Sequence, residues 1–210
     1  MAAPTCIVVG DLGTNCYLAD TPQGIVVIDP GAEAEEILRA LQRRGRPVVR
    51  AILLTHGHFD HTGAAQELAA ALGAPIYACA ADEAWLQGRL SIFGLRTPPV
   101  QATLFDDDRL LLDLDIAVMR TPGHTPGSVV YVTGEAAFVG DTLFAGSIGR
   151  TDLPGGDEEA IIESLRLLLR RLDDHLPLYP GHGPPTTLAQ ELRTNPWVQE
   201  AAEGLQEPSS

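Results

Sequence analysis

Lysine is absent from this 210-residue sequence, in which all 14 strongly basic residues are arginine. The absence excludes every mechanism that needs a lysine Schiff base or a lysine general base. The 28 acidic residues give a formal net charge of −14, and no arginine cluster offsets that charge locally. Because such a chain repels phosphate backbones, we expect no nucleic acid among its partners.

Cysteine is scarce, and long apolar runs are missing. Cys6, Cys16 and Cys79 are odd in number and widely spaced, so they predict neither a disulfide framework nor a CxxC motif. The first residues lack the basic and apolar segments of an export signal, and nowhere do 18 apolar residues follow one another. These absences predict a cytoplasmic protein that does not bind membranes.

Short apolar runs and amphipathic stretches alternate along the chain, which favours an α/β architecture with helices outside the sheets. With 45% hydrophobic residues, the chain suits a single domain over residues 1–205, followed by a disordered tail at 206–210. The predicted strands cover residues 6–10, 15–19, 24–29, 48–55, 74–78, 110–120, 128–133 and 136–139. The predicted helices cover residues 33–44, 64–73, a segment that Asp157 caps, and residues 186–197.

One long segment, residues 87–108, shows little periodicity of either kind. Loops of this length in compact domains are either lids and binding segments or plain irregular surface. The sequence leaves both interpretations open.

The stretch THGHFDHTG, residues 55–63, places His56, His58 and His61 within six positions, with Asp60 among them. A strand would turn His61 away from the other three side chains, and a helix would scatter all four. A loop that leaves a strand can direct His56 and His58 to one site and the next two side chains to a neighbouring site. The motif therefore predicts two metal ions, each in need of further ligands.

Three candidate ligands lie elsewhere, in loops that follow strand-like runs. They are His124 in TPGHTPG, Asp141 after AAFVG, and His182 in YPGHGPP. A single histidine in such a loop is more often structural than a ligand, but together with the HxHxDH motif these residues use five of the six histidines. We expect the sixth, His175, to be a solvated side chain. Five imidazoles and two carboxylates suit two divalent ions, zinc in the first place and iron or manganese as alternatives, with one carboxylate bridging them.

The motifs THGHFDH, TPGHTPGS, FVGDTLF and YPGHG, in this order along the chain, resemble the metallo-β-lactamase superfamily. Within it, GSIGRTDLPGGD and YPGHGPPTTLAQELRTNPW are similar to small bacterial glyoxalase II-like hydrolases. The resemblance implies a four-layer αββα sandwich with the metals at one edge. It also implies that His56, His58 and His124 bind the first metal, that Asp60, His61 and His182 bind the second, and that Asp141 bridges them. Asp29 matches a family position near the site, but a turn carboxylate explains it equally well, and it is not included in the catalytic set.

The resemblance further implies hydrolysis of a small-molecule thioester, of the hydroxyacylglutathione hydrolase type, by a hydroxide that bridges the two metals. Asp60 and Asp141 are then catalytic as well as metal-binding. His58 stands where flavodiiron proteins carry glutamate, and Asp141 stands where many β-lactamases carry cysteine. Both differences disfavour the reactions of those branches.

Three alternatives remain beside this expectation. The first is a mononuclear-iron persulfide dioxygenase of the same superfamily, with His56, His124 and Asp141 as ligands. The second is a metal-binding protein without turnover, which the complete set of ligands disfavours. The third concerns the substrate: only residues 183–210 follow the last ligand, where glyoxalase II enzymes carry a helical domain that holds glutathione. Arg150 either meets a substrate carboxylate or forms an ion pair with Asp152 or another acidic residue of the scaffold.

Overall fold

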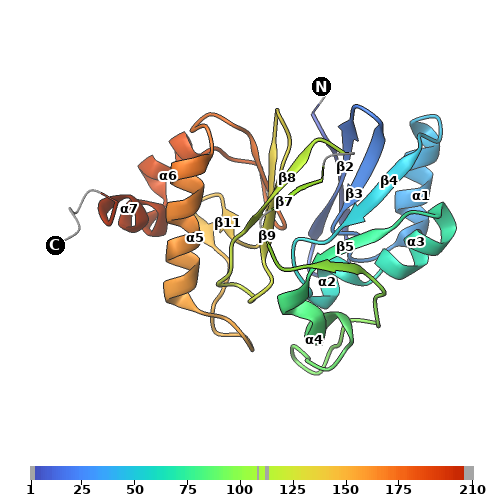
Figure 1. The fold of residues 1–210 in the computed structure, drawn as a ribbon, viewed down its shortest axis with the longest axis horizontal. Helices are drawn as coiled ribbons and strands as arrows, with labels where there is room; N and C mark the ends of the chain where they lie inside the picture. The colour runs from blue at the N-terminus through green and yellow to red at the C-terminus, as the bar shows by residue number, and fades with distance from the viewer. Residues whose placement is uncertain (1–2, 108, 112–113, 206–210) are drawn as a thin grey trace.

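Two β-sheets pack face to face between two outer layers of helices (Figure 1). The computed structural model describes residues 3–107, 109–111 and 114–205. This arrangement confirms the predicted four-layer αββα sandwich. The predicted tail at 206–210 lies outside the described residues.

The first sheet has six strands in the order β1-β2-β3-β4-β5-β6. Its bounds are β1 (Thr5–Val9), β2 (Thr14–Thr21), β3 (Gly24–Ile28), β4 (Val49–Leu53), β5 (Ile76–Cys79) and β6 (Thr103–Phe105). The first three strands are antiparallel, and β3 to β6 are parallel. Helices α1 (Ala34–Arg43) and α3 (Ala65–Leu72) cover its outer face, to the right in Figure 1.

The second sheet has five strands in the order β13-β10-β9-β8-β7. Its bounds are β7 (Arg109–Leu111), β8 (Ile116–Arg120), β9 (Val129–Val132), β10 (Ala137–Gly140) and β13 (Leu178–Pro180), and a small hairpin is formed by β11 (Leu143–Phe144) and β12 (Ser147–Ile148). Three helices cover its outer face, α5 (Glu158–Arg171), α6 (Leu188–Thr194) and α7 (Pro196–Glu203). The remaining helical segments are α2 (Phe59–Thr62), the 3₁₀ turn η1 (Ala80–Asp82) and α4 (Glu83–Leu86).

Three apolar clusters fill the spaces between the four layers. Strand β4 shows why: its side chains alternate between faces, with Ile52 packed under α1 and α3 and Leu53 packed between the sheets. Tyr131 of β9 lies in the cluster between the sheets, and its hydroxyl donates a hydrogen bond to the Leu54 carbonyl at 2.9 Å. The two sheets are therefore joined by a polar contact as well as by apolar packing.

Three predicted elements need correction. The strand expected over 110–120 is two antiparallel strands, β7 and β8, and residues 112–113 between them are not described. The helix expected over 186–197 is two helices, because Pro196 disfavours a helical conformation at Asn195, whose side chain instead caps α7. The segment 87–108 is not irregular throughout, since β6 extends the first sheet.

The part of that segment before β6 is connected to the predicted site. The hydroxyl of Thr97 donates a hydrogen bond to the Gly57 carbonyl, between His56 and His58, at 2.8 Å. Whether this loop moves as a lid stays a prediction. Among the described residues, no helix is long and apolar enough to cross a membrane.

Candidate metal centre

All seven predicted ligands lie close together, at the edge of the sandwich where α2 lies. Strand β4 ends just before His56 and His58, and the adjoining α2 carries Asp60 and His61. The other three residues follow strands of the second sheet: His124 comes after β8, Asp141 after β10, and His182 after β13. Loops from both sheets therefore meet at this edge.

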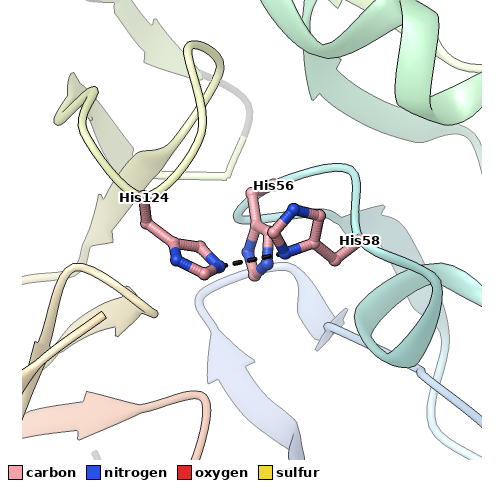
Figure 2. Close-up of side chains that lie close together, drawn as sticks. All are labelled: His56, His58 and His124. Atoms are coloured by element: carbon pink, nitrogen blue, oxygen red, sulfur yellow. Dashed lines mark hydrogen bonds between the residues drawn. The ribbon is translucent and has the colours of Figure 1, made fainter. Parts of the chain in front are cut away.

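His56, His58 and His124 form the first cluster, and their rings point toward one another (Figure 2). Nε2 of His124 lies 3.0 Å from Nδ1 of His58. All three side chains are buried. Burial, together with the neighbouring imidazole rings, lowers the pKa of His58 to about 2 and holds the pKa of His56 well below its ordinary value. These two rings are neutral at physiological pH, as metal coordination requires.

Asp60, His61 and His182 form the second cluster. Oδ2 of Asp60 lies 3.3 Å from Nε2 of His182 and 3.5 Å from Nε2 of His61. Burial opposes the charge on His61, but the carboxylates around it, with Asp141 first, raise its pKa to about 10. Burial likewise opposes the ionised form of Asp60, yet His61 and the hydrogen bonds from His182 and Thr14 hold its pKa below the ordinary value. This cluster therefore carries charge.

Asp141 lies between the two clusters. Its Oδ1 is 3.4 Å from Nε2 of His61 in the second cluster. Its Oδ2 is 3.5 Å from Nε2 of His124 in the first cluster and 3.6 Å from Nε2 of His182 in the second. The position is the one expected of a bridging carboxylate.

The hydrogen bonding at this edge tests whether the residues fit metal ions. Five buried side-chain atoms have no hydrogen-bond partner among the described residues: Nε2 of His56, His58 and His61, Oδ1 of Asp141, and the indole Nε1 of Trp85, which is no metal ligand. Leaving such a polar atom unpaired costs about 1–3 kcal/mol. Imidazole nitrogens and carboxylate oxygens are the donors that zinc and other borderline divalent ions take. The residues therefore fit a metal centre.

Asp29 contacts the site. The sequence alone did not decide between this position and a carboxylate that only forms a turn. Its Oδ2 lies 2.9 Å from Nδ1 of His61 and accepts a hydrogen bond from the Thr55 hydroxyl at 2.6 Å. That hydroxyl is in turn 3.1 Å from Nδ1 of His56. One carboxylate thus orients rings of both clusters. A sequence signal was present, because Asp29 directly follows β3, the parallel neighbour of β4.

Two further residues touch the clusters from outside. The hydroxyl of Thr14 donates a hydrogen bond to Oδ2 of Asp60 at 2.9 Å. The backbone carbonyl of Arg150 lies 2.8 Å from Nδ1 of His124. The guanidinium of Arg150 makes the ion pair with Asp152 that the sequence offered as one of two alternatives, at 2.7 Å. It also lies 5.8 Å from the centre of the Phe93 ring.

His175 is exposed, in agreement with the expectation of a solvated side chain. Its backbone N–H donates a hydrogen bond to Asp173. It therefore stands apart from the five clustered histidines.

Comparison with known proteins matches residues 9–182 to the family described as the metallo-beta-lactamase superfamily. The chain belongs to this superfamily. It is thus a member of a group of metal-dependent hydrolases, which agrees with the two clusters of donors. The fold is the metallo-β-lactamase fold that the motifs predicted.

Three relatives within the superfamily are close in sequence or structure. Hydroxyacylglutathione hydrolase GloC of Haemophilus influenzae is 38% identical over 198 residues, which cover 88% of this chain and 92% of the relative. The crystal structure of TTHA1623 in a di-iron-bound form is 42% identical, with a TM-score of 0.82 and coverage of 92% of this chain and 99% of that one. The BLEG-1 B3 metallo-beta-lactamase is 35% identical, with a TM-score of 0.83 and coverage of 93% and 99%.

Proposed function

We propose that this protein hydrolyses small-molecule thioesters, as glyoxalase II-like enzymes do, with two divalent metal ions at the edge of the sandwich. The observation that carries the proposal is the contact of Asp141 with both clusters, because it makes the seven donors one centre. The proposed ligands are His56, His58 and His124 for the first ion, Asp60, His61 and His182 for the second, and Asp141 for both. The activity named for the Haemophilus influenzae relative supports a thioester as the substrate.

Divalent ions bound at such a centre supply a hydroxide nucleophile near neutral pH and polarise the substrate carbonyl. The chain's own residues hold the donors in place for that chemistry. Asp29 fixes the Nδ1 side of His61 and leaves Nε2 facing Asp60 and Asp141. A thiol with an ordinary pKa of about 8.5 departs as thiolate with little help. No serine or cysteine of the chain has to act as a nucleophile.

The rival proposal is a persulfide dioxygenase with one iron on His56, His124 and Asp141. Oδ2 of Asp141 does lie 3.5 Å from Nε2 of His124. That assignment gives no task to Asp60 and His182, which lie 3.3 Å apart beside the same carboxylate. The use of every clustered donor favours two ions and hydrolysis.

Metal analysis combined with a substrate panel tests the proposal. The purified protein is analysed for bound metals and assayed with lactoylglutathione, with short acyl thioesters and with a chromogenic β-lactam, under air and under nitrogen. We expect two ions per chain and release of free thiol that does not depend on oxygen. One iron with oxygen uptake supports the dioxygenase, and β-lactam cleavage without thiol release supports a lactamase. Either result overturns the proposal.

A pair of histidine variants provides the control. His182→Ala removes a partly exposed member of the second cluster, and His175→Ala removes an exposed histidine outside both clusters. We expect His182→Ala to lower both metal content and thioester hydrolysis, and His175→Ala to change neither. Equal activity in the two variants contradicts the assignment of His182.

A further inference from the structure

A buried carboxylate outside the seven donors touches the loops of the first cluster. Asp82, at the end of η1, is 1% exposed. Its Oδ2 accepts hydrogen bonds from the Gly57 N–H at 2.8 Å and from the Thr125 hydroxyl at 2.7 Å. Its Oδ1 accepts a hydrogen bond from the Gly127 N–H at 2.8 Å. Burial raises the pKa of this carboxyl, and the three hydrogen bonds offset part of that effect.

The three donors belong to the two loops that carry the first cluster. Gly57 stands between His56 and His58, in the loop that follows β4 of the six-stranded sheet. Thr125 follows His124 directly, in the loop between β8 and β9 of the five-stranded sheet. A single carboxylate therefore joins loops of the two sheets at the point where their histidines meet.

Two glycines permit this close approach. A Cβ atom at Gly57 would lie 2.5 Å from Cβ of Trp85 and 3.2 Å from Cβ of Asp82. A Cβ atom at Gly127 would lie 2.5 Å from Cγ of Asp82 and 2.7 Å from its backbone nitrogen. Contacts under 3.0 Å force a shift of the backbone, so any larger residue at either position would separate the loop from Asp82.

The neighbourhood of His58 shows the same dependence. Trp85, three residues after Asp82 along the chain, packs edge-on against His58 with ring centres 4.6 Å apart. His58 also meets His124, at 3.0 Å between ring nitrogens. The segment that carries Asp82 and Trp85 therefore sets the separation of His58 and His124, although it contributes no metal ligand.

We propose that Asp82 is a positioning residue for the first metal ion. It holds the His56–His58 loop and the His124 loop at the spacing that three imidazoles need to share one ion. Outer partners of this kind typically contribute about 10- to 100-fold to metal affinity. The inference rests on the proposed ligands of the metal centre and is independent of the thioester reaction.

The test measures metal affinity at the first cluster alone. In a His182→Ala background, which disables the second cluster, the metal-free protein is titrated with zinc against a chromophoric chelator, with and without Asp82→Asn. The asparagine keeps the size of the side chain but leaves only one oxygen for three donors. We expect the zinc affinity to fall about 10- to 100-fold. A change of less than twofold overturns the inference.

Glu191 provides a matched control for the loss of a buried carboxylate. It is also 1% exposed and accepts hydrogen bonds from the Gly146 N–H at 2.7 Å, the Asn195 side chain at 2.9 Å and the Thr186 hydroxyl. We expect Glu191→Gln to lower the melting temperature to an extent similar to Asp82→Asn, but to leave zinc affinity within twofold. If both variants weaken zinc binding equally, Asp82 has only a general structural role.

A second pair of variants decides the matter if Asp82→Asn does not fold. Thr125→Val removes one donor to Asp82 at nearly constant volume, whereas Thr125→Ser keeps the hydroxyl. We expect the valine variant to lose several-fold in zinc affinity and the serine variant to match the parent; equal affinities overturn the inference. If the wild-type protein binds two ions and all these variants bind zinc as tightly as their parent, the role of Asp82 is refuted but the metal centre is not. A wild-type protein that binds no metal refutes the metal centre itself.

Discussion

The two clusters of the metal centre differ in charge and in access to solvent. The first cluster is three buried imidazoles, and burial lowers the pKa of His56 and His58. The second cluster contains a carboxylate and the partly exposed His182, whose side chain is 27% exposed, and nearby carboxylates raise the pKa of His61. One centre therefore combines a cluster in which burial favours the neutral forms of His56 and His58 with a cluster in which His61 must first release a proton.

The largest expected effect comes from the residue that the two clusters share. Asp141→Ala removes the carboxylate that contacts His61, His124 and His182. We expect hydrolysis to fall to background and metal content to fall with it, a larger loss than the roughly 100-fold that an outer partner can cause. Metal analysis and thiol release on the same preparation measure both effects. Full activity in this variant defeats the bridging assignment.

A contrast in pH dependence is expected between the clusters. His61, with its pKa raised to about 10, holds a proton at neutral pH that an ion must displace. Burial opposes the charge on His182, but the hydrogen bond with Asp60 raises the pKa of His182 as well. Affinity at the second cluster should therefore rise by at least about tenfold per pH unit, or at least about 100-fold from pH 6.5 to 8.5. His58, with its pKa lowered to about 2, loses no proton over that range. Chelator competition on His124→Ala, which keeps the second cluster, and on His182→Ala, which keeps the first, measures the two slopes. Equal slopes would remove the distinction.

A smaller effect is expected from Asp29, which contacts the second cluster directly and the first through Thr55. Asp29→Asn keeps the shape of the side chain but loses the charge that faces Nδ1 of His61. We expect affinity for the second ion to fall about tenfold or more, because outer carboxylates orient and polarise ligating histidines. Asp20→Asn, which breaks a pair with Arg44 away from the site, is the control. If Asp29→Asn weakens binding of the first ion alone, the direct contact of Asp29 with the second cluster is not the more important of its two contacts.

The smallest expected effect concerns a single hydroxyl. Thr14→Val removes the hydrogen bond to Oδ2 of Asp60. The net contribution of a hydrogen bond is about 0.5–1.5 kcal/mol, and we therefore expect about 3- to 10-fold weaker binding of the second ion. Thr14→Ser should restore the parent value in a calorimetric titration. Equal affinities of the valine and serine variants for the second ion would show that the hydrogen bond from Thr14 to Asp60 does not contribute to binding.

The elements with strong periodicity were predictable from the sequence, and so was the set of clustered donors. The helix after Asp157 and the strand before the THGHFDH motif follow from apolar spacing. The break at Asn195 depends on one proline, which the overall helical pattern obscures. The hairpin of β7 and β8 was hidden in an apolar run that reads as a single strand.

The outer partners could not be predicted in the same way. Asp82 accepts from Gly127, which is 45 positions away along the chain. Its partners are mostly backbone N–H groups, and any residue type supplies those, so no motif marks them. Asp29 left a weak signal at the end of a strand, and only the pairing of β3 with β4 gives it meaning. Side-chain chemistry is visible in a sequence, whereas distances across a fold are not.

The origin of the donors on two different sheets has a mechanical consequence. An ion bound by residues of both sheets would connect the two sheets, in addition to the hydrogen bond from Tyr131 to Leu54. Metal loading and the alignment of the sandwich are then thermodynamically linked, so chelation loosens the interface while loading stiffens it. Changes in the inter-sheet core should in consequence tune metal affinity from a distance, without altering any donor atom.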